Sequence, residues 1–250
     1  MPQRVFNLSS TMISAGPEGP EFRLGTSPVL IGDEVHIWRI QLDTDIFRAM
    51  SWENLLSGDE RERARRFRFS RDRNRFLTAR GILRLVLGAY LDADPRTLCF
   101  CYSPTGKPSL DGVHASSGVK FNVSHSEDVA VFAITQDREI GIDVERVRFD
   151  VDLDSIAERF FSVAEQKTFM AIPASDKPKA FFNCWTRKEA FVKAKGVGLS
   201  LPLDQFDVSL IPGQPARLLA TRPDPGEANR WSLMAPDVGA EYAVAIVMQG

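Results

Sequence analysis

Gly141-Ile142-Asp143-Val144-Glu145 is the stretch that decides the fold and around which the sequence is organised. It lies in a predicted strand over residues 140–144. Because successive side chains of a strand point to opposite faces, Asp143 and Glu145 share one face while Ile142 and Val144 share the other. Two carboxylates at this spacing repel each other unless a cation or solvent lies between them. The pattern favours a divalent metal site, although taken alone it is more typical of a charged, exposed strand edge.

A second stretch, residues 185–193, has the sequence Trp-Thr-Arg-Lys-Glu-Ala-Phe-Val-Lys. It lies in a predicted helix that begins at Asp176 and ends near Gly196, where a glycine cap is expected. On a helical wheel, Glu189 falls within an apolar stripe formed by Phe181, Phe182, Trp185 and Val192. A carboxylate on the core-facing side needs a cation or a strong donor, because an unpaired buried charge is costly. The alternative is a surface pair of Glu189 with Lys193, worth about 0.3 kcal/mol, and the wheel alone favours neither.

Asp143, Glu145 and Glu189 together would form an all-oxygen site. Oxygen ligands without His or Cys favour magnesium, or manganese, over zinc. Magnesium usually binds one or two carboxylates together with substrate phosphates, so this site predicts a phosphate ester or anhydride as substrate. The basic groups available for its other oxygens are Lys193, Lys107, His125 and part of an arginine cluster.

The arginine cluster lies between residues 61 and 84. Its members are Arg61, Arg63, Arg65, Arg66, Arg68, Arg71, Arg73, Arg75, Arg80 and Arg84. Charge runs of this kind are common on solvated helix surfaces, and the alternative is that several of these arginines bind phosphate or an acidic partner. The contrast with a net-acidic chain favours the second interpretation.

Composition limits the class of protein. The chain has 250 residues, 44% of them apolar, which is enough for one large or two small domains. With 31 basic and 33 acidic residues the net charge is −2, which argues against nucleic acid as a partner. Three cysteines do not make a disulfide framework or a four-ligand zinc site, so a reducing cytoplasm is expected. We expect neither a signal peptide nor a membrane span.

Hydrophobic periodicity and capping signals predict alternating groups of helices and strands. Capping boxes at Ser57/Glu60 and Ser162/Glu165 each open a helix. The predicted helices cover residues 45–56, 57–69, 72–91, 152–161, 162–172 and 176–196. The predicted strands cover residues 35–42, 98–102, 121–125, 129–134, 140–144, 206–210, 217–221, 231–234 and 242–248. The similarity between residues 130–134 and 243–247 is weak evidence for an internal repeat.

Several common enzyme motifs are missing from the sequence. It contains no Gly-x-x-x-x-Gly-Lys-Ser/Thr, Gly-x-Gly-x-x-Gly or Gly-x-Ser-x-Gly, so P-loop, Rossmann and α/β-hydrolase chemistry lack their structural parts. Ser124 and His125 are neighbours on a predicted strand and should point to opposite faces, which is poor geometry for a nucleophile and its base.

Taken together, the motifs resemble those of the 4′-phosphopantetheinyl transferases of the surfactin-synthetase-activating (Sfp-like) type. Residues 141–145 resemble the family's Gly-x-Asp-x-Glu motif, and residues 185–196 its Trp-x-x-Lys-Glu-Ala-x-x-Lys-x-x-Gly motif. Further similarities are the Asn-hydrophobe-Ser-His-Ser segment at 122–126, the Gly-Lys-Pro turn at 106–108 and the arginine region with Arg65-Arg66-Phe67 and Arg75. Where the family often has a lysine near the start of the arginine helix, this chain has Glu60.

The resemblance implies an α+β fold, a pseudo-twofold arrangement of two similar α/β half-domains. We expect these to be residues 1–137, with the coenzyme A contacts, and 138–250, with the magnesium and catalytic residues. It also implies transfer of the phosphopantetheine group of coenzyme A to a serine of an acyl, peptidyl or aryl carrier protein, with release of adenosine 3′,5′-bisphosphate. Such carriers serve polyketide, nonribosomal peptide or fatty acid biosynthesis, and a monomer is the expected state.

By the same resemblance, Asp143, Glu145 and Glu189 would hold magnesium, Glu189 would help to deprotonate the serine and Lys193 would stabilise the leaving phosphate. Contacts to the phosphates or the adenosine are expected from Arg63, Arg75, Lys107, Ser124 and His125. Two other classes of protein stay open from the sequence: another magnesium-dependent phosphotransferase or hydrolase, and a non-catalytic module that binds coenzyme A or a carrier protein.

Overall fold

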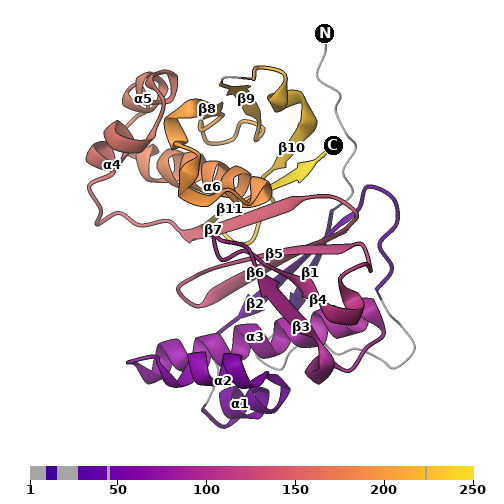
Figure 1. The fold of residues 1–250 in the computed structure, drawn as a ribbon. Coiled ribbons are helices and arrows are strands. Elements are labelled where there is room, and N and C mark those ends of the chain that lie inside the picture. Colours follow the sequence, from indigo (N-terminus) through magenta and orange to yellow (C-terminus); the bar gives the residue numbers. More distant parts are fainter. Residues whose placement is uncertain (1–9, 16–27, 44–45, 223) are drawn as a thin grey trace.

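The protein is built from two sheets that pack face to face, with helices on the two outer sides (Figure 1). The computed structural model describes residues 10–15, 28–43, 46–222 and 224–250. In its described part, no helix has both the length and the apolar character needed to cross a membrane.

The first half of the chain, up to residue 137, forms a four-stranded sheet in the order β1-β2-β6-β5. Its strands are β1 (Ser10–Ala15), β2 (Val35–Gln41), β5 (Val119–Ser126) and β6 (Val129–Gln136), and a separate hairpin joins β3 (Cys99–Tyr102) to β4 (Pro108–Asp111). Its helices are α1 (Ile46–Trp52), α2 (Gly58–Arg65) and α3 (Ser70–Leu91). The apolar face of α3 packs on one side of this sheet through residues such as Ile82, Val86 and Phe132.

The second half, from residue 138 onward, forms a three-stranded sheet in the order β10-β11-β7. Its strands are β7 (Ile140–Arg146), β10 (Trp231–Met234) and β11 (Tyr242–Gln249), with a hairpin of β8 (Phe206–Val208) and β9 (Leu218–Thr221). Its helices are α4 (Leu153–Phe160), α5 (Val163–Met170) and α6 (Lys177–Lys195), of which α6 covers the outer face of this sheet.

The two halves repeat one topology, which confirms the predicted pseudo-twofold α+β fold. In each half a strand, β2 or β7, leads into three helices and a hairpin, and two further strands then complete the repeated unit. The first half has one additional strand, β1, which pairs parallel with β2. The last strand of each half lies between two strands and pairs antiparallel with both: β6 lies between β2 and β5, and β11 lies between β10 and β7. The similar segments 130–134 and 243–247 lie in these two strands.

The two sheets meet through a shared apolar layer. Ile140, Ile142 and Val144 point from β7 into this layer, where they meet residues of β2 and β6 such as Ile37 and Val131. The opposite face of β7 is left for Gly141, Asp143 and Glu145, as the alternation predicts.

Gly141 lets α6 lie unusually close to β7. A Cβ atom at this position would lie 2.1 Å from the carbonyl oxygen of Ala190 and 2.3 Å from the backbone nitrogen of Ala194. Because backbone atoms cannot move aside as a flexible side chain can, only glycine fits here. The close approach brings the middle and end of α6 against the carboxylates of β7.

Most predicted elements are confirmed, and the differences have local causes. The helix predicted over 57–69 ends at Arg65, and Phe69 is extended at the start of α3, which begins at Ser70 rather than Asp72. Strand β4 was not predicted, because Pro108 begins it and turn residues surround it. Strand β1 was not predicted either, and the predicted start of the first helix at Asp45 lies outside the described residues. Strand β8 ends at Val208, where a register irregularity interrupts its pairing with β9.

Candidate active site

The two halves meet along strands β5 and β7, which belong to different sheets. Polar side chains at alternate positions of β5 bridge this junction in place of a regular ladder. Asn122 Oδ1 accepts a hydrogen bond from the backbone N–H of Ile142 at 2.8 Å, and Ser126 Oγ accepts one from the backbone N–H of Arg146 at 3.1 Å. These bonds fix the register of β7 against the first half.

A network of three side chains lies at the centre of this junction. Ser124 Oγ donates to Asp143 Oδ1 at 2.9 Å, and Lys193 Nζ, from α6, donates to the same carboxylate oxygen at 2.7 Å and to Ser124 Oγ at 3.0 Å. Asp143 is almost completely buried, with 4% of its surface exposed. Its other oxygen, Oδ2, is buried and has no hydrogen-bond partner among the residues the structure describes.

Glu145 and Glu189 complete the acidic side of the network. Burial raises the pKa of each above its ordinary value, and the nearby negative charge of Asp143 raises both further. Lys193 acts in the opposite direction on both pKa values, and Ser126 Oγ donates to Glu145 Oε2 at 2.8 Å. Three carboxylates that disfavour one another's charge are therefore held at one place by strands β5 and β7 and helix α6.

The position of Glu189 decides between the two interpretations of the sequence. Its side chain is half-buried and lines a cavity, while Lys193 binds Asp143 instead of Glu189. Across the described ranges, no ion pair joins Glu189 to Lys193. The surface pair is therefore wrong as the explanation for Glu189.

The donor set of this site suits a hard cation. Its oxygens come from carboxylates, and one of them, Asp143 Oδ2, is buried without a hydrogen-bond partner among the described residues. In the part of the chain that the structure describes, however, no three acidic, His or Cys side chains converge closely enough to form a complete metal site. The residues fit magnesium in their chemistry, and the arrangement seen has the Lys193 ammonium as the cation that binds Asp143.

Several basic side chains lie near the three carboxylates. The protein partly desolvates the His125 ring, which lowers its pKa although the residue is exposed at the surface. The positive charges of Lys193, Arg63 and Arg75 lower this pKa further. Arg63 lies over the ring of Phe76, at 5.3 Å from its centroid. Arg75 is less available, since it forms two hydrogen bonds with Asp43 at 2.6 and 3.0 Å.

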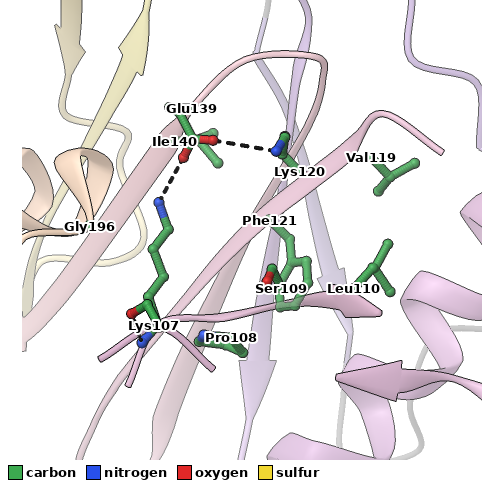
Figure 2. Close-up of a pocket in the computed structure, with 11 residues that line it drawn as sticks. Lys107, Pro108, Ser109, Leu110, Val119, Lys120, Phe121, Glu139, Ile140 and Gly196 are labelled. Atoms are coloured by element: carbon green, nitrogen blue, oxygen red, sulfur yellow. Dashed lines mark hydrogen bonds and ion pairs between the residues drawn. The ribbon is translucent and has the colours of Figure 1, made fainter. Parts of the chain in front are cut away.

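Lys107 lines one cavity together with Glu189 and Lys193, but its ammonium is paired elsewhere. Its ammonium binds Glu139 Oε2 at 3.2 Å, and Glu139 also pairs with Lys120 at 3.4 Å (Figure 2). Lys107 lines a cavity of about 260 Å³ with these partners and with apolar residues such as Phe121. The structure therefore brings together Asp143, Glu145, Glu189, Lys193, Ser124 and His125, with Arg63 and Arg75 nearby, and it turns the charge of Lys107 toward Glu139.

Two cavities adjoin the site on either side of the 103–108 turn. One, of about 180 Å³, has an apolar floor and is lined by Arg63, Arg80, Tyr102 and His125 among others. The other, of about 300 Å³, is lined by Lys107, Glu189 and Lys193 among others. Both include Gly106, Pro108 and Val123, so they meet where the turn approaches β5. An extended molecule with a polar middle would fit along them.

The arginine cluster divides into structural and solvent-facing members. Arg84 is fully buried and pairs with Glu60 at 2.7 Å, and Arg80 pairs with the same carboxylate at 3.3 Å. Arg65 and Arg66 are exposed and only approach Glu62, at 3.6 Å. Of the two functional candidates, Arg63 lines a cavity and Arg75 binds Asp43.

Sequence reasoning gave no role to Asn122, Ser126 and Glu139. The signal for the first two was the run of polar residues at alternate positions 122, 124 and 126 in a predicted strand, which indicates one polar face. No local pattern pointed to Glu139, because its partner Lys107 is distant in sequence.

Sequence comparison relates both halves to one group of enzymes. Residues 139–247 match the profile of the 4′-phosphopantetheinyl transferase superfamily, and residues 45–137 match that of the 4′-phosphopantetheinyl transferase N-terminal region.

Individual relatives agree with these profiles. The chain is 42% identical to the 4′-phosphopantetheinyl transferase HetI of a Nostoc species over 219 residues, which is 87% of this chain and 89% of HetI. It is 34% identical to the 4′-phosphopantetheinyl transferase Sfp of Bacillus subtilis over 157 residues, or 63% of this chain and 67% of Sfp. Among solved structures, the holo-[acyl-carrier-protein] synthase of Thermotoga maritima aligns with 44% of this chain and 62% of its own, with a TM-score of 0.37 and 26% identity. That structural match is too partial to bear on the site.

Proposed function

The chain belongs to the 4′-phosphopantetheinyl transferase superfamily, and from this premise we propose that Asp143, Glu145, Glu189 and Lys193 form its catalytic centre. The reaction transfers the 4′-phosphopantetheine group of coenzyme A to a serine of a carrier protein, which converts the apo form to the holo form. The observation that carries the residue assignment is the junction network, in which Lys193 and Ser124 bind one oxygen of Asp143 and leave the other buried without a partner.

The reaction exchanges one phosphorus–oxygen bond for another. The serine oxygen forms a bond to the β-phosphorus of coenzyme A, the bond from that phosphorus to the bridging oxygen breaks, and the electron pair leaves with adenosine 3′,5′-bisphosphate. Glu189 accepts the serine proton, directly or through a water molecule, because its carboxylate lines the cavity beside Lys193. Lys193 neutralises or protonates the leaving phosphate.

Asp143, Glu145 and Glu189 are the residues that would hold Mg²⁺, with Mn²⁺ as a substitute. When bound, the ion would supply positive charge for the pyrophosphate oxygens. The orphaned oxygen of Asp143 and the mutual repulsion of the three carboxylates support this assignment.

Coenzyme A would lie in the two adjoining cavities. We assign its phosphates and adenosine to the basic groups of the first half, with Arg63 and His125 at one cavity and Lys107 at the other, assisted by Ser124 and Arg75. Residues 1–137 would thus mainly bind coenzyme A, and residues 138–250 would carry the metal and the proton transfers.

The partner is an acyl, peptidyl or aryl carrier protein of polyketide, nonribosomal peptide or fatty acid biosynthesis. We propose that the enzyme is a cytoplasmic monomer, because each chain already contains both halves of the pseudo-twofold fold and three cysteines without a disulfide.

The test is to incubate the protein with coenzyme A, Mg²⁺ and an apo carrier protein and to weigh the carrier by mass spectrometry. A gain equal to the phosphopantetheine group supports the proposal, and loss of the gain on adding a chelator supports the metal. An unchanged carrier across acyl, peptidyl and aryl types would overturn it. Hydrolysis of coenzyme A without a modified carrier would indicate a phosphohydrolase, and binding alone would indicate a non-catalytic module.

A further inference from the structure

The turn formed by residues 103–108 of the first half crosses to the carboxyl end of α6 in the second half. Thr105 Oγ1 donates to the backbone carbonyl of Gly196 at 3.0 Å, and Lys107 Nζ donates to that of Ala194 at 3.3 Å. The turn also packs closely there, since a Cβ on Gly198 would lie 2.8 Å from Thr105 Cγ2.

These contacts satisfy groups that a helix cannot satisfy by itself. The last carbonyl groups of an α-helix have no partner within the helix, and a cation near them is favourable because the helix dipole is negative at that end. In α6 both the cation and the hydroxyl come from the other half of the molecule. The end of the helix is therefore fixed relative to the first half.

The turn is also held by hydrogen bonds within itself. Its two ends are joined by a backbone bond from Ser103 N–H to the Lys107 carbonyl at 3.0 Å, and Gly106 N–H binds the Ser103 carbonyl at 2.8 Å. The Ser103 and Thr105 hydroxyls lie 2.8 Å apart within hydrogen-bonding distance. A preorganised turn loses little entropy when it holds the helix.

Glu139 determines where the Lys107 ammonium lies. Its carboxylate holds the ammonium at 3.2 Å (Figure 2), and the Ala194 carbonyl accepts a hydrogen bond from the same ammonium at 3.3 Å. Burial lowers the pKa of Lys107, and Glu139 counteracts this by favouring the charged form. Glu139 immediately precedes β7, so one carboxylate connects the start of β7, the turn and the end of α6.

We propose that Thr105 and Glu139 are positioning residues for the transfer reaction. Acting through Gly196 and Lys107, they set the last turn of α6, which carries Lys193, against Asp143 on β7. We name these contacts of Thr105, Lys107 and Glu139 the α6 latch. The inference rests on the proposed catalytic role of Lys193 and adds Thr105 and Glu139, which act through Gly196 and Lys107 and not on the reacting atoms.

The first experiment compares Glu139→Gln with Lys120→Gln as a matched control. Lys120 pairs with the same carboxylate, and across the described residues no hydrogen bond or ion pair joins its side chain to α6. Because a displacement of catalytic groups by even 1 Å can cost ~100-fold in rate, we expect Glu139→Gln to lower kcat by ~10-fold with KM for coenzyme A within about twofold. Lys120→Gln should change neither constant. A lower KM with unchanged kcat in Glu139→Gln would overturn the latch, since it would mean that Glu139 only withholds Lys107 from coenzyme A.

The second experiment uses the other contact of the latch. Thr105→Val should lower kcat several-fold while Thr105→Ser, which keeps the hydroxyl, should restore it. Because both contacts act on one helix end, the losses in Thr105→Val and Glu139→Gln should be less than additive in the double variant. Fully additive losses, or equal activity of the valine and serine variants, would overturn the proposal.

Amide hydrogen exchange separates the latch from the enzyme assay. Exchange at residues 192–196 should become faster in Thr105→Val and in Glu139→Gln, with little change in the amides of β6. An inactive wild-type protein would contradict the proposed function and leave this measurement intact. Unchanged exchange at 192–196 in both variants would contradict the latch itself.

Discussion

The two halves share a topology and a buried ion pair, yet they differ at almost every position of the site. In the first half, Glu60 of the capping box at α2 pairs with Arg84 on α3 at 2.7 Å. In the second half, Glu165 of the capping box at α5 pairs with Lys188 on α6, also at 2.7 Å.

The cations of these two pairs have matching surroundings. Arg84 donates to the carbonyl groups of Pro95 and Leu98, just before β3, and Lys188 donates to those of Leu203 and Phe206, at the start of β8. Each pair joins a short helix, a long helix and the approach to a hairpin. These two ion pairs therefore stabilise the fold and take no part in the proposed reaction.

The long helices can be aligned by their left-handed C-caps, Asp92 and Gly196. In this alignment Arg84 and Lys188 coincide, which supports it. Glu189 then corresponds to Leu85 and Lys193 to Ala89. Both first-half residues are apolar, so α3 has no equivalent of the two side chains that we propose to be catalytic.

The strands show the same difference. Phe132 and Ala245 are the third residues of the similar segments 130–134 and 243–247, and their partners across the ladder are Trp38 and Asp143. Trp38 is buried in the apolar core beneath α3. A few polar side chains at corresponding positions, together with the close approach at Gly141, therefore distinguish the second half from its apolar counterpart.

The largest expected effect comes from removing the polar residues that only the second half has. Asp143→Ala and Glu189→Gln should each lower transfer by at least about 10³-fold, because each removes charge that acts on the reacting phosphate. Glu158→Gln, an exposed change on α4, is the matched control and should keep full activity. The assay is carrier modification by mass spectrometry, with thermal unfolding to confirm the fold. Full activity in Glu189→Gln would show that Glu189 is not catalytic, and that this polar residue of the second half does not account for the activity.

The buried ion pairs give the next largest effect, on stability. Lys188→Met leaves Glu165 charged and unpaired in the core, which should lower the free energy of unfolding by about 3–5 kcal/mol. Arg84→Met should cost less, because Arg80 still lies 3.3 Å from Glu60. Urea unfolding measures both values. Equal losses of stability would show that Arg80 does not stabilise Glu60 once Arg84 is removed, and that the two ion pairs are energetically equivalent.

Much of this comparison could be predicted from the sequence, because capping boxes, strand alternation and glycine caps are local signals. The alternation placed Asp143 and Glu145 on one face, and the two capping boxes located α2 and α5. The helical wheel placed Glu189 within the apolar stripe but left its surface pair with Lys193 open, and the structure decides against that pair. These predictions needed only the periodicity of a single element.

Contacts between elements could not be predicted in this way. A wheel gives the face of a helix but not which strand lies opposite, so it could not show that Lys193 binds Asp143 rather than Glu189. Nothing local connects Lys107 with Glu139, and the arginines of α2 and α3 look alike until the fold buries Arg84 and exposes Arg66. The division of the cluster is a tertiary property.

Arg63 in α2 and Arg66 at its C-cap should differ in their effect on coenzyme A binding, and this effect is smaller than the previous two. Arg63 lines the cavity beside His125, so Arg63→Gln should raise KM for coenzyme A by ~10-fold, equivalent to about 1.4 kcal/mol, with little change in kcat. The side chain of Arg66 is 76% exposed, and Arg66→Gln should change KM by less than about twofold. Steady-state kinetics at fixed carrier concentration tests both. Equal effects would mean that the first half binds coenzyme A through overall charge instead of one residue.

The smallest effect concerns His125, which lies where the halves meet. Burial, then Lys193, Arg63 and Arg75, lower its pKa below the ordinary 6.5, while Asp143 opposes them. The folded protein therefore binds fewer protons at His125 than the unfolded chain as pH falls below 6.5, so this residue reduces stability in that range. As pH falls from 7.5 to 5.5, the free energy of unfolding of the wild type should therefore decrease relative to that of His125→Asn.

Titration of the His125 ring by NMR measures this residue directly. Its midpoint should lie below 6.5 in the free protein, because the basic groups of both halves surround it. Adenosine 3′,5′-bisphosphate should raise the midpoint, since bound phosphate would offset the same positive charges. Arg63→Gln should raise it in the free protein, whereas Arg66→Gln should not. If neither the ligand nor Arg63→Gln changes the midpoint, His125 lies outside the phosphate site. The arginines would then be the basic residues of the first half that bind the phosphates.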